Sequence, residues 1–275
     1  MIFLDEKVVT MMVTLYQVDA FTGQPFRGNP AAVCLLNAPK PDSWMQALAA
    51  EMNLSETAFL LSEGDQSGWQ LRWFTPTTEV DLCGHATLAS ARVLFERQPE
   101  LRSEPLIFQT RSGELRARWV DGAVELDFPM MAPEPLEVES DLTDILGFQP
   151  VAAAYHGNYF LFEAPDAAAV RVAKPDFIAL AESQTPEVMI TAQSDVEDFD
   201  FISRFFAPQL GINEDPVTGS AHCLLAPYWA DKLDKTQLSA YQASARGGML
   251  QVRLEGDRVR IAGEATIIFK AELLV

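Results

Sequence analysis

The chain has 275 residues, of which 48% are hydrophobic and 21% charged, enough apolar material for one large domain or two of about 130 residues each. Its formal net charge is −19, from 39 acidic and 20 basic residues, and no Lys/Arg cluster interrupts the acidity. A nucleic-acid-binding protein needs a basic face to meet phosphates, so the composition excludes that class and leaves a soluble, acidic surface.

Cysteine usage and hydropathy exclude several further classes. Cys34, Cys83 and Cys223 are too few and too widely spaced for a disulfide framework or a Cys-x-x-Cys zinc site. The N-terminal segment lacks the apolar region of a signal peptide, and no uncharged stretch approaches the roughly 20 apolar residues of a membrane span. We therefore expect a cytoplasmic protein without a membrane partner, and the three histidines are too scattered to predict a metal site.

Apolar and β-branched runs predict strands along the whole chain. The expected strands cover residues 14–20, 31–36, 57–61, 69–75, 105–109 and 123–128 in the first half, and 151–155, 158–163, 187–192, 200–207, 249–255, 258–263 and 266–273 in the second. An amphipathic helix is predicted over residues 42–53, with Asp42 as its N-cap. These elements indicate a β-rich protein with few surface helices.

Each half also contains one helix that is apolar on almost every face. These helices are predicted over Gly84–Glu96 and Gly219–Asp231. A helix without a polar face must be enclosed rather than laid on a surface. The sequence thus predicts an α+β fold of two β-rich domains, each wrapped around one central helix.

A weak internal repeat supports two similar domains. Three pairs of pieces recur in the same order: Gly28-Asn29 and Gly157-Asn158, the RWFTP of 72–76 and the RFFAP of 204–208, and Glu79 and Glu214, each five residues before a glycine. Their offsets are 129, 132 and 135, close to half the chain length. We expect an N-terminal domain over residues 1–130 and a C-terminal domain over 131–263, joined at a segment rich in proline and acidic residues.

The N-termini of the two central helices carry the residues suited to chemistry. A helix N-terminus presents unpaired N–H groups and a positive dipole end, so it can bind a carboxylate or an enolate-like oxyanion. The residues there are Cys83, Gly84 and His85 in one half, and Asp215, Thr218, Gly219 and Ser220 in the other. An acid/base group on each side of a shared cleft would serve the removal and return of a proton at carbon.

Four segments of the chain resemble the phenazine-biosynthesis isomerase family of PhzF-like proteins, which shares its fold with diaminopimelate epimerase and proline racemase. They read YQVDAFTGQPFRGNPAAV from residue 16, MNLSETAFL from residue 52, RWFTPTTEVDLCGHATLA from residue 72 and NEDPVTGSAH from residue 213. The resemblance runs from about residue 14 to the C-terminus, which makes Met11 or Met12 alternative initiators.

The resemblance implies a diaminopimelate epimerase-like fold, in which each pseudo-symmetric domain is a mixed β-barrel-like sheet around its central helix. It further implies that the C-terminal strand, 264–275, joins the first domain, that the active site needs no cofactor, and that the protein is a homodimer. By the family's motifs, Glu56 is the acid/base, with His85 and Asp215 as the other catalytic residues. The substrate-binding residues are then expected to be Asn29, Cys83, Gly84, Thr218, Gly219 and Ser220.

Three functions remain open at this point. The first is a cofactor-independent isomerase that moves a proton on carbon of a small, anionic, carboxylate-bearing metabolite through Glu56, whose pKa burial would raise. The second is an amino-acid epimerase that uses Cys83 and a carboxylate, since a helix N-terminus lowers the pKa of a thiol. The third is a binding protein without catalysis. His85 is expected to be neutral at its helix N-terminus, and His156 is a weaker candidate for the cleft.

Overall fold

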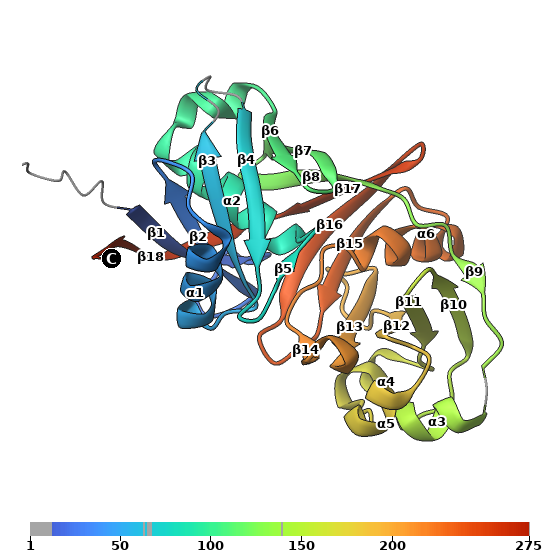
Figure 1. Cartoon of the computed structure of the whole chain (residues 1–275). Helices are drawn as coiled ribbons and strands as arrows, with labels where there is room; N and C mark the ends of the chain where they lie inside the picture. Colours follow the sequence, from blue (N-terminus) through green and yellow to red (C-terminus); the bar gives the residue numbers. More distant parts are fainter. Residues whose placement is uncertain (1–12, 63, 65–67, 139, 275) are drawn as a thin grey trace, which may run out of the picture.

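The strands of the protein form one continuous hydrogen-bonded system in which the second half of the chain repeats the first (Figure 1). The computed structural model describes residues 13–62, 64, 68–138 and 140–274. The expected alternative initiators, Met11 and Met12, lie outside the described residues.

In the N-terminal half the elements are β1 (Val13–Ala20), β2 (Asn29–Leu36), α1 (Asp42–Met52), β3 (Glu56–Ser62), β4 (Gly68–Phe74), β5 (Glu79–Val80), α2 (Gly84–Arg97), the short 3₁₀ helix η1 (Pro99–Ser103), β6 (Leu106–Thr110), β7 (Gly113–Val120) and β8 (Ala123–Pro129). The C-terminal half contains β9 (Glu134–Pro135), α3 (Ser140–Leu146), β10 (Ala152–His156), β11 (Tyr159–Glu163), α4 (Ala167–Val172), α5 (Phe177–Glu182), β12 (Glu187–Gln193), β13 (Phe201–Ala207), η2 (Pro208–Leu210), β14 (Ile212–Asp215), α6 (His222–Leu233), β15 (Gln237–Gln242), β16 (Gly248–Glu255), β17 (Arg258–Gly263) and β18 (Ala265–Leu273).

Every strand expected from the sequence is present, with its ends shifted by a residue or two. The expectation omitted β5, β7, β9, β14 and β15 and the short helices α3, α4 and α5. β7 is largely exposed and β15 carries polar side chains, so neither shows the apolar run on which the prediction relied.

The strand pairing follows the same order in both halves. β2 pairs parallel with β3, β3 antiparallel with β4, and β4 parallel with β6, which begins the antiparallel series β6–β7–β8. β11, β12, β13, β15, β16 and β17 repeat this series. The predicted α+β fold with two pseudo-symmetric units is therefore confirmed, while the residue boundaries of the two domains remain a prediction.

Two strand pairs join the two halves: β8 pairs antiparallel with β17, and β18 with β1. β9, which follows β8, pairs with β10 within the C-terminal half. The C-terminal strand thus returns to the N-terminal half, as the sequence predicts, and Figure 1 shows it beside β1.

The two central helices are buried, and the expected N-terminus of the second one is wrong. α2 begins at Gly84 as predicted and is buried as far as Phe95, apart from the partly exposed Arg92. α6 begins at His222, three residues after Gly219. The preceding residues form a tighter turn, in which the N–H of His222 donates to the carbonyl of Gly219 at 3.0 Å.

The first surface helix also differs from the prediction at its N-terminus. The N-cap of α1 is Pro41, and Asp42 is the first helical residue. One residue inside the N-cap, the Asp42 carboxylate makes no capping hydrogen bond and pairs with Arg72, whose Nη1 lies 2.8 Å from its Oδ1.

The core has one central part and two outer parts. The central cluster contains α2, α6 and the inner strand faces of both halves. Smaller apolar clusters lie under α1 in the N-terminal half and under α3, α4 and α5 in the C-terminal half.

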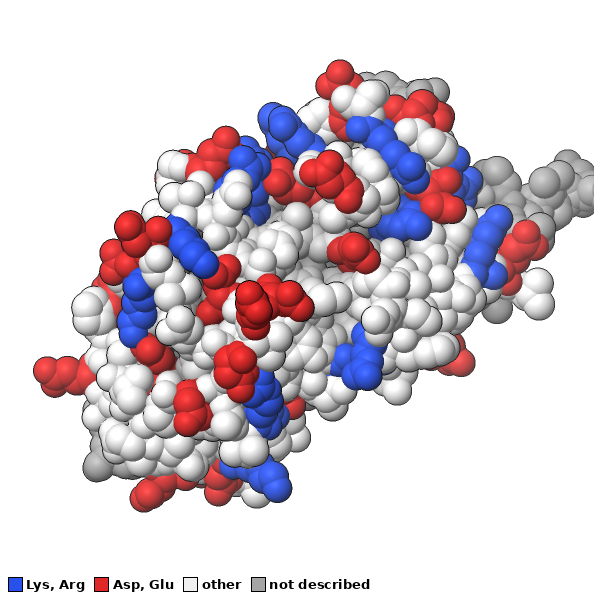
Figure 2. Space-filling view, turned by 180° about the vertical axis from the view of Figure 1, so that it is seen from behind, with Lys and Arg blue, Asp and Glu red and all other residues white. Residues whose placement is uncertain are grey.

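Acidic and basic side chains are interspersed on the face shown in Figure 2, as expected for a dispersed charge of −19. Among the described residues, none of the helices has the length and apolar character needed to cross a membrane.

Candidate active site

Gly84, the first residue of α2, lies against Gly219 in the turn that precedes α6. A Cβ atom on Gly84 would lie 3.6 Å from the Cα of Gly219 and 3.8 Å from the backbone N of Ser220, which are ordinary contact distances. A Cβ atom on Gly219 would lie 3.3 Å from the ring of Phe21, a tight contact. The segments at the start of the two central helices therefore touch, as the sequence predicts.

Glu56, Cys83 and His85 form a buried cluster at the N-terminus of α2. Glu56 is the first residue of β3, and its Oε2 lies 3.2 Å from His85 Nε2. On the other side of the imidazole, His85 Nδ1 lies 3.5 Å from Cys83 Sγ. The side chains of Glu56 and His85 are only 13% and 6% exposed. The structure thus brings together three predicted residues from two segments of the chain.

Burial decides the charge of all three groups. It raises the pKa of Glu56 to about 8, with a further contribution from the negative charge of Asp215, against a hydrogen bond from the Cys83 thiol. It lowers the pKa of His85 to about 3, so the imidazole is neutral as predicted, although burial rather than the helix dipole is the cause. The pKa of the Cys83 thiol is raised well above its ordinary value by burial and by Glu56, which disfavours the thiolate that the epimerase alternative needs.

Asp215, at the end of β14, is held by side chains from both halves. Asn29 Nδ2 donates to Asp215 Oδ1 at 2.8 Å and to the Val217 carbonyl at 2.9 Å. The Thr218 hydroxyl donates to Asp215 Oδ2. Burial raises the pKa of Asp215 to about 6, against these two side-chain hydrogen bonds. Asp215 acts electrostatically on Glu56, which places these two carboxyl groups in one site.

Gln242, which the sequence analysis did not identify, fixes the loop after Asp215. Its fully buried amide accepts from the Thr218 N–H at 2.8 Å and donates to the Asp215 carbonyl at 2.9 Å and to the Thr218 hydroxyl at 3.2 Å. Gln242 ends β15, 27 residues beyond Asp215, so no local pattern signalled its role.

Ser220 lies in the turn before α6 and accepts a hydrogen bond from the hydroxyl of Tyr159 at 3.0 Å. Tyr159 begins β11 and immediately follows Gly157-Asn158, the second copy of the Gly-Asn repeat. The Gly-Asn repeat is the sequence feature that could have identified Tyr159 as a site residue. His156, the weaker candidate of this segment, instead bonds through Nδ1 with the Ala132 carbonyl at 3.0 Å.

The two helix N-termini repeat a local hydrogen bond with different residues. The Thr87 hydroxyl donates to the Cys83 carbonyl at 2.6 Å, four residues back. In the other half, His222 Nδ1 lies 2.9 Å from the Thr218 carbonyl, also four residues back. His222 is fully buried and its ring packs on Phe201 at 5.9 Å between centroids. His222, absent from the prediction, therefore has a structural role equivalent to that of Thr87.

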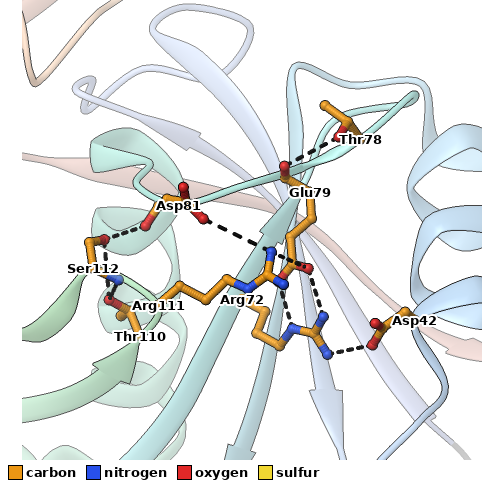
Figure 3. A network of polar contacts seen from close by, with 8 residues as sticks. All are labelled: Asp42, Arg72, Thr78, Glu79, Asp81, Thr110, Arg111 and Ser112. Atoms are coloured by element: carbon orange, nitrogen blue, oxygen red, sulfur yellow. Dashed lines mark hydrogen bonds and ion pairs between the residues drawn. The ribbon is translucent and has the colours of Figure 1, made fainter.

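An ion-pair network supports the segment that leads to Cys83 (Figure 3). Arg72 on β4 reaches both oxygens of Glu79 on β5, with Nε at 2.7 Å from Oε1, and it also pairs with Asp42. Arg111 lies 2.8 Å from Glu79 and 3.9 Å from Asp81. Two guanidinium groups thus hold the short strand after which α2 begins.

The repeat supplies the same support in the C-terminal half. Arg204 on β13 binds both oxygens of Glu214 on β14, with Nε at 2.7 Å from Oε1. Its Nη1 also donates to the Ala173 carbonyl at 2.7 Å. Glu214 directly precedes Asp215, so this pair fixes the backbone that carries the second carboxyl group of the site.

Three buried polar atoms of the site have no hydrogen-bond partner. They are Asn29 Oδ1, Glu56 Oε2 and His85 Nε2. Although 3.2 Å apart, the Glu56 and His85 atoms are not aligned for a hydrogen bond. Buried polar atoms usually pair with protein or water, so these three are available to bind a ligand or a water molecule. Cavities of about 480 and 680 Å³ are lined by other residues.

The cluster also contains a set of donors suited to a metal, which the sequence analysis did not expect. Among the described residues, one oxygen of Glu56, the Cys83 sulfur and one His85 nitrogen lie within 4.8 Å of one another. A metal would bind the carboxylate and the thiolate, so its binding would release the protons that burial favours on both groups in the metal-free protein.

Comparison with known proteins identifies the family. A sequence profile of the PhzC-PhzF family, described as phenazine biosynthesis-like protein, matches residues 18–271. The chain belongs to this family. An uncharacterized isomerase of Halalkalibacterium halodurans is 49% identical over 267 residues, covering 96% of this chain and 100% of that protein. An uncharacterized isomerase of Pseudomonas aeruginosa is 50% identical over 258 residues, covering 94% of this chain and 97% of that protein.

Solved structures of the PhzF family share the fold. The crystal structure of a PhzF-family phenazine biosynthesis protein from Enterococcus faecalis has a TM-score of 0.91 at 44% identity, covering 96% of this chain and 100% of that one. A hydroxyproline epimerase from Agrobacterium vitis has a TM-score of 0.62 at 14% identity, which reflects the fold alone. The resemblance read from the sequence is confirmed, and the family supports an isomerase or epimerase role.

Proposed function

We propose that this PhzF-family protein is a cofactor-independent isomerase that moves a proton between carbon atoms of a small carboxylate-bearing metabolite. The observation that carries the proposal is Glu56, a buried carboxyl group with a pKa raised to about 8. A general acid/base works best when its pKa lies near the working pH, because both protonation states are then accessible. Glu56 can therefore accept a proton from one carbon and return it to another.

In this mechanism the ionised Glu56 takes the proton, and the electron pair left on carbon delocalises into the substrate's conjugated oxygen. The backbone N–H groups beside Gly84 and Gly219, with the Ser220 hydroxyl, hold that oxygen and the substrate carboxylate. The neutral imidazole of His85 lies 3.2 Å from Glu56, and its unpaired Nε2 is available to orient the substrate or relay a proton. Asp215 and Asn29 bound the site from the opposite side. Protonated Glu56 then delivers its proton to the second carbon.

The epimerase alternative has less support. A two-thiol mechanism needs a cysteine at each helix N-terminus, but Thr218 precedes Gly219 where Cys83 precedes Gly84. Burial also disfavours the thiolate of Cys83. An epimerase mechanism that pairs Cys83 with a carboxylate remains, but it would first require ionisation of the Cys83 thiol. A binding protein without catalysis is the other alternative, and it would exchange no protons.

Deuterium incorporation tests the proposal and identifies a substrate in the same experiment. The protein is incubated in D₂O with pools of β,γ-unsaturated, hydroxy-diene and amino acids, and mass spectrometry identifies a compound that gains deuterium at carbon. Glu56→Gln keeps the shape of the side chain but cannot accept the proton, so it should abolish incorporation. His85→Asn and Asp215→Asn should each reduce the rate by about 10²–10⁴-fold.

The exposed Glu51 of α1 offers a matched control, because Glu51→Gln removes a glutamate outside the site. This variant should exchange at the wild-type rate. Wild-type exchange by Glu56→Gln on the same compound would show that Glu56 is structural and would refute the mechanism.

A further inference from the structure

The strand register places a second glutamate, Glu187, at the position equivalent to Glu56. Arg72 and Arg204 are equivalent in the repeat, and they lie opposite Phe59 on β3 and Ile190 on β12. Counting back three residues from each of these partners leads to Glu56 and Glu187, the first residues of their strands. The C-terminal half therefore retains a carboxyl group where the N-terminal half has its acid/base.

Glu187 lies beside a chain of hydroxyl groups that leads into the site. Tyr159 is its register partner on the parallel strand β11, and the two side chains interact. The Tyr159 hydroxyl donates to Ser220 Oγ at 3.0 Å. Ser220 follows Gly219 as His85 follows Gly84, so the two residues occupy equivalent positions in the repeat. Glu187 thus reaches Ser220 through Tyr159, whereas Glu56 approaches His85 directly.

We propose that Tyr159, supported by Glu187, is a positioning residue that fixes the Ser220 hydroxyl as a donor to the anionic group of the substrate. A serine hydroxyl has one proton and rotates freely unless a partner orients it. Because Ser220 Oγ accepts from Tyr159, its own proton is directed away from Tyr159 and toward the site. This assignment rests on the proposed function in placing an anion at Ser220.

Burial governs the protonation of Tyr159 and Glu187. It raises the pKa of Tyr159, which keeps the phenol protonated and able to donate to Ser220. It also raises the pKa of Glu187, against a hydrogen bond with Tyr159 that lowers it. The contacts therefore link Glu187 through Tyr159 to Ser220.

Calorimetric titration with sodium benzoate, an unreactive planar carboxylate, tests the proposal independently of catalysis. Ser220→Ala removes a hydrogen bond to an anion and should weaken benzoate binding roughly 10- to 100-fold. Tyr159→Phe keeps the ring that packs on Phe205 and should weaken binding roughly 3- to 10-fold. Because Tyr159 acts through Ser220, adding Tyr159→Phe to Ser220→Ala should change the affinity less than about twofold.

Two further variants separate positioning from packing. Glu187→Gln keeps a hydrogen-bonding side chain beside Tyr159 and should bind benzoate like the wild type, whereas Glu187→Leu should resemble Tyr159→Phe. Tyr155→Phe is the matched control, since Tyr155 on the neighbouring strand donates to Glu134 at 3.0 Å outside the site. Its affinity should be unchanged.

The inference would be overturned by wild-type affinity in Tyr159→Phe, by fully additive losses in the double variant, or by a wild-type protein that does not bind benzoate. None of these outcomes depends on proton exchange. Conversely, suppose that no compound exchanges deuterium, while the effects of Tyr159→Phe and Ser220→Ala on benzoate affinity are non-additive as expected. The proposed isomerase function then fails and the Tyr159–Ser220 assignment stands.

Discussion

Replacing Glu56 by glutamine should stabilise the folded protein relative to the wild type, and the gain in the free energy of unfolding should grow as the pH rises. Between pH 4.5, the ordinary pKa of a glutamate, and about 8, its pKa in the fold, the folded protein keeps a proton on Glu56 that the unfolded chain has released. Folding therefore takes up a proton in this window, and the free energy of unfolding falls as the pH rises. Glutamine is neutral in both the folded and the unfolded protein, so the Glu56→Gln variant does not lose stability in this way as the pH rises.

The size of the effect follows from the two pKa values. One pKa unit corresponds to about 1.4 kcal/mol, so the wild type should lose about 3 kcal/mol through Glu56 between pH 5 and pH 8. Glu56→Gln should therefore gain about 3 kcal/mol relative to the wild type over the same interval. Urea unfolding of both proteins at several pH values, followed by far-UV circular dichroism, measures the difference.

The matched control is again Glu51→Gln, which removes an exposed carboxyl group of α1 and should leave the pH dependence of stability unchanged. Subtracting each variant from the wild type also cancels the titration of groups that do not interact with the replaced residue. A stability difference between Glu56→Gln and the wild type that is equal at pH 5 and pH 8 would show that the fold does not hold a proton on Glu56. The acid/base assignment would then lose its physical basis.

Four other predictions concern the supports of the site and the assembly. Gln242→Leu should lower the free energy of unfolding by about 2–4 kcal/mol in urea titrations, because it leaves buried backbone groups unpaired. Arg204→Met should cost more stability than Arg116→Met, since Arg204 is 13% and Arg116 54% exposed in their ion pairs; equal losses would contradict the argument. Cys83→Ala should keep most deuterium exchange, and iodoacetamide should inactivate the wild type slowly; a complete loss in Cys83→Ala would favour the epimerase. We also propose a homodimer from family membership alone, which light scattering would contradict by finding a monomer at micromolar concentration.

Local pattern was sufficient to locate the elements that build the site. The apolar periodicity around Gly84–Phe95 identified a buried helix, since only an enclosed helix tolerates apolar residues on every face. The RWFTP and RFFAP pieces identified equivalent strands, and their arginines make equivalent pairs with Glu79 and Glu214. These features depend on residues close together in the sequence, so they could be read before the fold was known.

The sequence motifs also selected residues that the fold brings together. Glu56 and His85 come from different motifs yet lie 3.2 Å apart, and Asn29 reaches Asp215 across 186 residues of chain. Their residue types suggested acid/base chemistry. Which atoms face one another followed only from the meeting of the two helix N-termini at Gly84 and Gly219.

Tertiary structure alone decided the protonation states and the supporting residues. The N-terminus of α2 left a reactive Cys83 open as an alternative, but burial raises the pKa of this thiol and favours its protonated form. Gln242 and the Tyr159–Ser220 hydrogen bond join segments 24 and 61 residues apart, and Asp42 pairs with Arg72, 30 residues away. Desolvation and long-range hydrogen bonds depend on what surrounds a group in space, and no pattern of neighbouring residues along the chain records those surroundings.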